Sequence, residues 1–78
     1  MEDKRIRRNL YRVLRKTGVQ KNDIQPGASY IRDLNFDTVD WQIFTFYLEG
    51  IFDISLRDEE LLNFWSVNDT LQYLRNTA

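Results

Sequence analysis

Carboxylates are the residues of this sequence whose type and spacing come nearest to a chemical site. One group pairs Asp37 with Asp40, and another is the acidic run 58–60. Neither group has the alternating ligands and the turn glycine of an EF-hand calcium loop. The sequence contains no histidine and no cysteine, which excludes Ser-His and Cys-His catalytic triads, thiolate zinc sites and disulfides. We therefore predict no catalytic residue and no metal site, in a protein that is not an enzyme.

Both acidic groups have a structural interpretation as helix starts. Asp37 precedes an apolar run and suits an N-cap, and Asp40 would lie in the first turn, where its charge favours the helix dipole. Residues 58–60 would likewise lie in the first turn of a short helix. We favour this interpretation over cation binding, because acidic residues are expected in first turns.

Helical spacing of apolar residues predicts a first helix from Asp3 to Thr17. One face of that helix is apolar, and arginines and lysines occupy the remaining faces. Asp3 suits the N-cap, and Gly18, after a basic last turn, suits the C′ position. The apolar face consists of Ile6, Leu10, Val13, Leu14 and Thr17, with Tyr11 at its edge.

A second helix, near residues 38–52, is apolar nearly all round. Such a helix is either buried on every side or bound to a partner. Ile43, Phe46 and Tyr47 fall outside the face that a core requires. We favour the core for Tyr47, whereas core and contact surface are equally open for Phe46. The predicted core face consists of Phe44, Leu48 and Phe52, widened by Trp41 and Ile51.

The remaining segments predict a long connection, a short third helix and a fourth helix. Turn residues and Pro26 mark residues 19–35 as the connection. A short helix fits within residues 56–64, and a start resembling a capping box at residue 66 opens a fourth helix near 66–76. The apolar residues of the connection predicted to reach the core are Ile24, Ala28, Tyr30, Ile31 and Leu34.

Length and composition indicate one all-α domain over residues 1–78. The chain is 42% hydrophobic and 14% aromatic, and its three glycines and one proline are too few for a turn-rich β fold. No apolar run approaches the roughly 18 residues of a membrane span, and the N-terminus lacks the apolar core of a signal peptide. We expect a soluble, cytoplasmic protein without membrane insertion.

Charge is distributed unevenly along the chain. Residues 1–21 contain eight of the eleven basic residues and two acidic residues, whereas residues 22–78 contain three basic and ten acidic residues. This asymmetry suggests either two different binding faces or attraction between the two parts. A basic first helix could also bind nucleic acid or an anionic membrane. The isoelectric point of about 5.3 favours a solvated face that balances the acidic remainder, so we expect no nucleic-acid partner.

Three consecutive motifs resemble the acyl carrier protein family. Residues 33–40 read D-L-N-F-D-T-V-D and resemble the signature D-L-G-x-D-S-L-D. Upstream, residues 25–30 (Q-P-G-A-S-Y) resemble T-P-D-A-S-F. Downstream, residues 48–59 (L-E-G-I-F-D-I-S-L-R-D-E) resemble L-E-E-E-F-x-x-x-I-P-D-E. The resemblance covers about residues 18–74 and implies a four-helix bundle with a long first loop and a short third helix.

The resemblance also implies a position for a prosthetic group. In the family, the serine of D-S-L accepts 4′-phosphopantetheine, and the matching residue here is Thr38, directly after Asp37. Threonine places an extra methyl beside the attacking oxygen, so we expect an acyl-carrier-protein-like module that carries no cofactor and acts through protein–protein contacts. The alternative is a genuine acyl or peptidyl carrier, loaded at Thr38 in fatty-acid, polyketide or related biosynthesis.

Partner contacts are expected along the second helix. The family displays acidic residues there and docks basic enzymes with them. This chain keeps Asp40 and Glu49 but has Ile43 and Gly50 where acidic residues are common. We predict protein partners, including biosynthetic enzymes, and a monomer or weak homodimer. The candidate partner-binding residues are Val39, Asp40, Ile43, Phe46 and Glu49.

Overall fold

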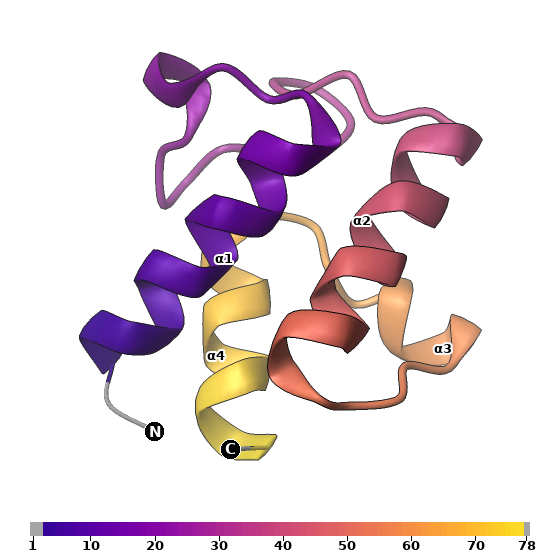
Figure 1. Ribbon diagram of the computed structural model, residues 1–78. Helices are drawn as coiled ribbons and strands as arrows, with labels where there is room; N and C mark the ends of the chain where they lie inside the picture. Colours follow the sequence, from indigo (N-terminus) through magenta and orange to yellow (C-terminus); the bar gives the residue numbers. More distant parts are fainter. Residues whose placement is uncertain (1–2, 78) are drawn as a thin grey trace.

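Four α-helices and one short 3-10 helix make up the computed structural model, which describes residues 3–77 (Figure 1). No strand occurs among these residues, and one isolated antiparallel bridge joins Ser29 to Ser66. The all-helical prediction is therefore confirmed. The elements are α1 (Asp3–Thr17), the 3-10 helix η1 (Lys21–Asp23), α2 (Thr38–Phe52), α3 (Asp58–Leu61) and α4 (Val67–Thr77).

Helix α1 is described over Asp3–Thr17, the predicted range, but Asp3 has a different role. Asp3 was expected as the N-cap, yet it lies inside the first turn, where its Oδ1 is 2.7 Å from Arg75 Nε on α4. An aspartate is favourable both as an N-cap and inside the first turn, where its negative charge interacts well with the helix dipole. The residue type alone therefore does not distinguish the two positions. Gly18 ends the helix as predicted, at a φ of 107° that side chains rarely adopt.

Helix α2 begins with a capping box. The Asp37 carboxylate accepts a hydrogen bond from Asp40 N–H at 2.9 Å, and the Asp40 carboxylate accepts one from Asp37 N–H at 3.1 Å. Two N–H groups that a helix start leaves without partners are thereby satisfied. The helix ends at Asp53, whose φ of 55° turns the chain toward α3. The predicted span of 38–52 is confirmed.

The core is built around α1, which packs against both α2 and α4. Leu10, Val13 and Leu14 are fully buried, and α2 contributes Phe44 and Leu48, which are also fully buried. Fully buried leucine and phenylalanine side chains each contribute about 1.5–3 kcal/mol through the hydrophobic effect. Helix α4 adds Val67, Leu71 and Leu74.

The prediction of which α2 face enters the core is confirmed at the centre of that face. The residues at its edges are less buried. Trp41, Ile51 and Phe52 are half-buried and pack against the core without being enclosed by it. Phe52 is the last residue of α2, so the chain turns away beside it. Phe52 therefore belongs to the core face, as predicted, without being fully buried.

The long connection between α1 and α2 is pinned to the start of α4. Tyr30 N–H donates to Trp65 C=O at 3.0 Å, and Val67 N–H donates to Ala28 C=O at 3.0 Å. The Tyr30 hydroxyl lies 2.6 Å from the Thr70 hydroxyl, in a contact that is entirely buried. Because this segment is fixed to α4 by backbone and side-chain bonds, it forms a wall of the core.

One residue of the connection was misplaced by the sequence prediction. Ile31 was expected in the core but is 58% exposed, whereas Ile24, Ala28 and Tyr30 are buried. Ser29 N–H donates to the Asp33 carboxylate at 2.7 Å, and Asp33 N–H donates to Ser29 C=O at 2.9 Å. These bonds close a tight turn with Ile31 at its tip, so the side chain points away from the core.

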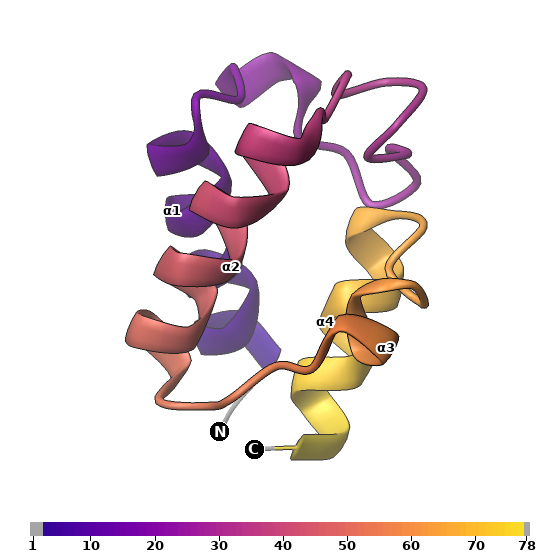
Figure 2. The same ribbon diagram turned by 90° about the vertical axis from the view of Figure 1, so that its right-hand side faces the viewer.

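The third helix is shorter than predicted, and the fourth begins as predicted. Helix α3 spans only Asp58–Leu61, inside the expected range 56–64. Ser66 and Asp69 form the expected reciprocal bonds at the start of α4. Ser66 N–H donates to the Asp69 carboxylate at 3.1 Å, and Asp69 N–H donates to the Ser66 hydroxyl at 3.4 Å. In Figure 2, α1 and α2 stand on one side of the molecule, and α3 and α4 stand on the other.

Candidate functional site

The outer face of α2 carries a row of exposed apolar side chains. Val39 is 58% exposed, Ile43 36% and Phe46 71%. Their spacing of four and three residues places them on one face of the helix, opposite the fully buried Phe44 and Leu48. We call Val39, Ile43 and Phe46 the outer stripe. Exposed apolar patches of this kind mark interaction sites on soluble domains.

Next to the outer stripe, α2 is hollowed at a glycine. A groove of about 340 Å³ is lined by Phe46, Tyr47, Glu49, Gly50 and Ile51. A Cβ atom added at Gly50 would meet no other atom within 4 Å, so the surface is open at this residue. Tyr47 is half-buried and turned toward α1, since Lys16 Nζ lies 5.5 Å from the centre of its ring.

Thr38, the residue that matches the attachment serine, is exposed at the first position of α2. Its hydroxyl forms no hydrogen bond with another residue of the range 3–77. The flanking carboxylates of Asp37 and Asp40 are engaged in the capping box. A phosphate on this hydroxyl would lie at the positive end of the helix dipole, so the position itself is compatible with a phosphodiester.

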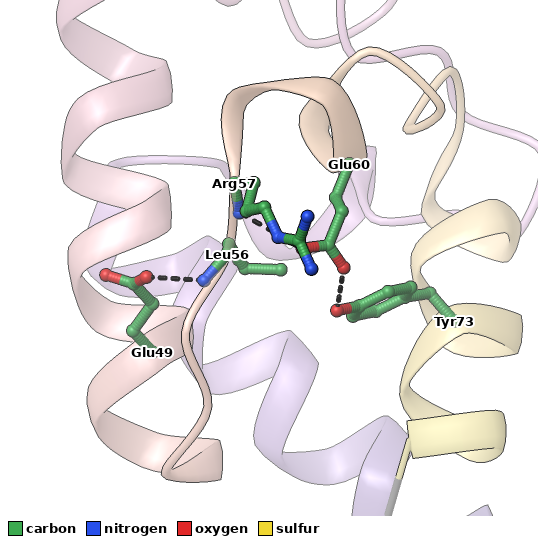
Figure 3. Close-up of polar contacts among 5 residues, drawn as sticks. All are labelled: Glu49, Leu56, Arg57, Glu60 and Tyr73. Carbon is green, nitrogen blue, oxygen red and sulfur yellow. Dashed lines mark hydrogen bonds and ion pairs between the residues drawn. The ribbon is translucent and has the colours of Figure 1, made fainter.

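Glu49, the other predicted docking acid, has a partner inside the molecule. Its Oε2 accepts a hydrogen bond of 2.7 Å from Leu56 N–H, which ties the end of α2 to the segment before α3 (Figure 3). The predicted acids Asp40 and Glu49 therefore both support the local backbone. Their role in docking stays a prediction.

Glu60 and Tyr73 form a second polar link, between α3 and α4. The Tyr73 hydroxyl donates to Glu60, whose other carboxylate oxygen accepts from Arg57 N–H at 3.1 Å (Figure 3). The bond from Tyr73, then that from Arg57, lowers the pKa of Glu60. The same bond raises the pKa of Tyr73, because it stabilises the protonated phenol. This link holds α3 against α4.

An apolar pocket of about 390 Å³ lies between α3 and the start of α2. Leu62 is 76% exposed and Trp65 is 72% exposed beside it. Sequence reasoning missed both residues. The signal that could have found Leu62 is the pair Leu61-Leu62, since a one-turn helix can bury only one of two adjacent side chains. The pocket is lined by Ile31, Trp41, Asp58, Leu61, Leu62, Phe64 and Trp65.

The basic residues of α1 do not pair with the acidic part of the chain. Within residues 3–77, the two ion pairs join Arg57 to Glu60 and Arg75 to Asp3, and neither uses a cation of α1. The expected balance between basic and acidic parts is therefore not made by direct contacts among these residues. The α1 cations are Lys4, Arg5, Arg7, Arg8, Arg12, Arg15 and Lys16.

Comparison with known families gives no identification, because no protein-family model matches this sequence. None of the helices within residues 3–77 is long and apolar enough to cross a membrane. The same residues contain no group of three or more metal-ligating side chains.

The structure brings the predicted residues Thr38 and Asp37 together at the start of α2, and it places Val39, Ile43 and Phe46 along the outer face of α2.

Proposed function

We propose that this protein is an acyl-carrier-protein-like module that binds a protein partner through the outer stripe of α2 and carries no phosphopantetheine. The observation that carries the proposal is the exposure of Val39, Ile43 and Phe46 on the face of α2 opposite the core. A small domain with few large apolar residues to spare gains stability by burying them. Three that remain exposed in one row favour a contact surface.

The order and lengths of the helices support the carrier-like fold. A long connection precedes α2, and α3 is a single turn between two longer helices. Both features are those that the family resemblance implies. The residue that matches the attachment serine also lies where the resemblance implies, at the exposed start of α2.

Thr38 argues against ordinary loading for a steric reason. A transferase site that orients a primary alcohol must accommodate one extra methyl at the attacking carbon. A positional error of about 1 Å can lower a rate by about 100-fold. Gly50 and Ile43 also replace acids at positions where the family grips its partner enzymes. The outer surface of α2 therefore favours apolar contacts over the family's acidic docking.

The apolar pocket favours a second candidate function. Trp41, three residues after Thr38, forms part of its lining. A chain attached at Thr38 could place an apolar group there, which supports a genuine carrier in fatty-acid, polyketide or related biosynthesis. When bound, phosphopantetheine would supply the thiol that holds an acyl group. Thr38 would be its attachment point, and the capping box would keep that hydroxyl at the helix start.

Intact-mass spectrometry tests the two candidates directly. The protein is incubated with coenzyme A, magnesium and a broad-specificity phosphopantetheinyl transferase, in parallel with Thr38→Ser. We expect the unaltered chain to remain unmodified. Loading of Thr38→Ser alone would show that the methyl is the barrier and that the docking surface is competent. A phosphopantetheine adduct on Thr38 in protein isolated from native cells would contradict the proposal and favour the carrier.

Photo-crosslinking tests the outer stripe as the contact surface. A photoreactive amino acid replaces Phe46 in native cells, and a matched probe replaces Gln72, which is exposed on α4. We expect a discrete crosslinked protein from position 46 and none from position 72. Equal crosslinking at the two positions, or none at position 46, would contradict binding through the outer stripe.

A further inference from the structure

The basic face of α1 forms a groove that the proposed function does not use. Its volume is about 560 Å³, and η1 contributes Lys21 to its lining. Tyr11 and Ile24 contribute an apolar floor, so the groove is more than a row of solvated charges. Its cationic lining consists of Arg8, Arg12, Arg15, Lys16 and Lys21.

The occupant of this groove must be anionic and partly apolar. Arg8, Arg12 and Arg15 repeat at about one per turn along α1, so they present guanidinium groups in a line. Guanidinium groups bind carboxylates in a bidentate manner. A flat membrane surface fits poorly, because the apolar face of α1 is buried in the domain's own core and is not available for insertion.

A surface of the complementary kind occurs at α3 of this same chain. The first turn of α3 contains three acidic residues, Asp58, Glu59 and Glu60, directly after the single cation Arg57. Asp58 and Glu59 are exposed on α3, and the helical turn places Leu62 on the same side, 76% exposed. This acidic and apolar surface matches the charge and the apolar floor of the α1 groove.

The two surfaces cannot meet within one molecule. Figures 1 and 2 both place α1 and α3 on opposite sides of the domain. We infer that the α1 groove binds the α3 surface of a second copy, so that molecules associate head to tail. The residues of this contact are distinct from the outer stripe, and the inference is independent of the proposed function.

Physical considerations set the conditions under which the association forms. The net charge of −1 leaves little overall repulsion between copies. Exposed ion pairs are individually weak and are screened by salt, so association requires concentrated protein at low ionic strength. Because the two contact surfaces differ, association continues beyond a dimer unless the geometry closes a ring.

Sedimentation velocity of the full chain at low salt tests the inference with two one-sided variants. Arg12→Gln/Arg15→Gln removes two of the five cations that line the groove, and Asp58→Asn/Glu59→Gln removes the two exposed carboxylates of α3. The unaltered protein should rise to at least twice its monomer mass with concentration. About 0.5 M salt should weaken the self-association at least tenfold. Each variant alone should remain monomeric. An equimolar mixture of the two should recover association but stop at heterodimers, because only one intact interface remains.

The matched control is Lys4→Gln/Arg7→Gln, which removes the same charge from α1 outside the groove. It should associate within twofold of the unaltered protein. Circular dichroism of every variant checks that the helices persist. Three results would overturn the inference: a monomer at all concentrations in low salt, an equal loss in the control, or a mixture that stays monomeric. Association abolished by Phe46→Glu but unchanged in the groove variant would assign the contact to the outer stripe instead.

Discussion

The inner and outer faces of α2 are both apolar, yet they have opposite surroundings. Phe44 and Leu48 on the inner face are fully buried, whereas Val39 and Phe46 on the outer face are more than half exposed. Composition alone does not separate these faces. The separation arises because α1 and the connection before α2 cover the inner face, whereas Val39 and Phe46 on the outer face remain exposed. One apolar helix therefore contains both a buried face and an exposed apolar face.

Truncation of the two faces should give the largest difference. Phe44→Ala and Leu48→Ala should each lower the free energy of unfolding by about 2–5 kcal/mol, because each leaves a cavity in a closed core. The matched change Phe46→Ala should alter it by less than about 0.5 kcal/mol. Urea unfolding followed by circular dichroism measures all three. Similar losses on both faces would show that the outer stripe also supports the fold.

The connection between α1 and α2 covers the inner face of α2, and substitution of Tyr30 tests how that connection is held. Its ring lies 5.1 Å from Trp41 and 5.3 Å from Phe44, measured between ring centres. Tyr30→Phe keeps these contacts but leaves the buried Thr70 hydroxyl without its partner. The free energy of unfolding should fall by about 1–3 kcal/mol. Tyr30→Phe combined with Thr70→Val should recover part of this loss. No recovery would indicate that the bond is not what fixes the connection.

Alkaline pH should destabilise the folded protein, because the same buried tyrosine must then ionise. Burial raises the pKa of Tyr30 well above its usual range, so the phenol stays protonated in the folded state. Stability from this group is complete below the unfolded pKa of about 10 and falls as pH rises above it, by about 1.4 kcal/mol per pH unit. Tyr73, whose pKa is also raised, adds to the same trend.

The measurement is the melting temperature between neutral pH and pH values above 10, relative to each protein's own neutral value. Tyr30→Phe should lose less than the unaltered chain, because it lacks the buried titrating group. An equal alkaline loss in the two proteins would assign the effect to other groups. Phe46→Ala, which leaves the inner side unchanged, should follow the unaltered chain.

The smallest expected effect concerns a hydroxyl at the margin between the faces. Thr45 Oγ1 is buried without a hydrogen-bond partner among residues 3–77. Thr45→Val replaces it with a methyl of similar shape, so the free energy of unfolding should rise by about 1 kcal/mol. Thermal unfolding measures this gain. A loss of stability would mean that the hydroxyl has a partner, such as an ordered water.

Sequence patterns predicted most of the helical structure, because helix signals are local. The capping box of Asp37 and Asp40, the end of α1 at Gly18 and the buried face of α1 all follow from residues within a few turns of one another. The predicted position of Thr38 in the first turn, directly after the cap Asp37, followed from the same local pattern. Failures such as Ile31 occurred where a turn, and not a helix, decides the direction of a side chain.

The sequence by itself determined where helices start and stop and which residues could lie on each face, since periodicity and capping depend on near neighbours. Only the tertiary structure decided which apolar face is covered, because burial depends on segments distant in the chain. It placed Phe46 in solvent, brought Tyr30 against Thr70 over 40 positions, and left the α1 cations without acidic partners among residues 3–77. Charges far apart in sequence pair only if the fold brings them together, and here α1 and α3 are held on opposite sides.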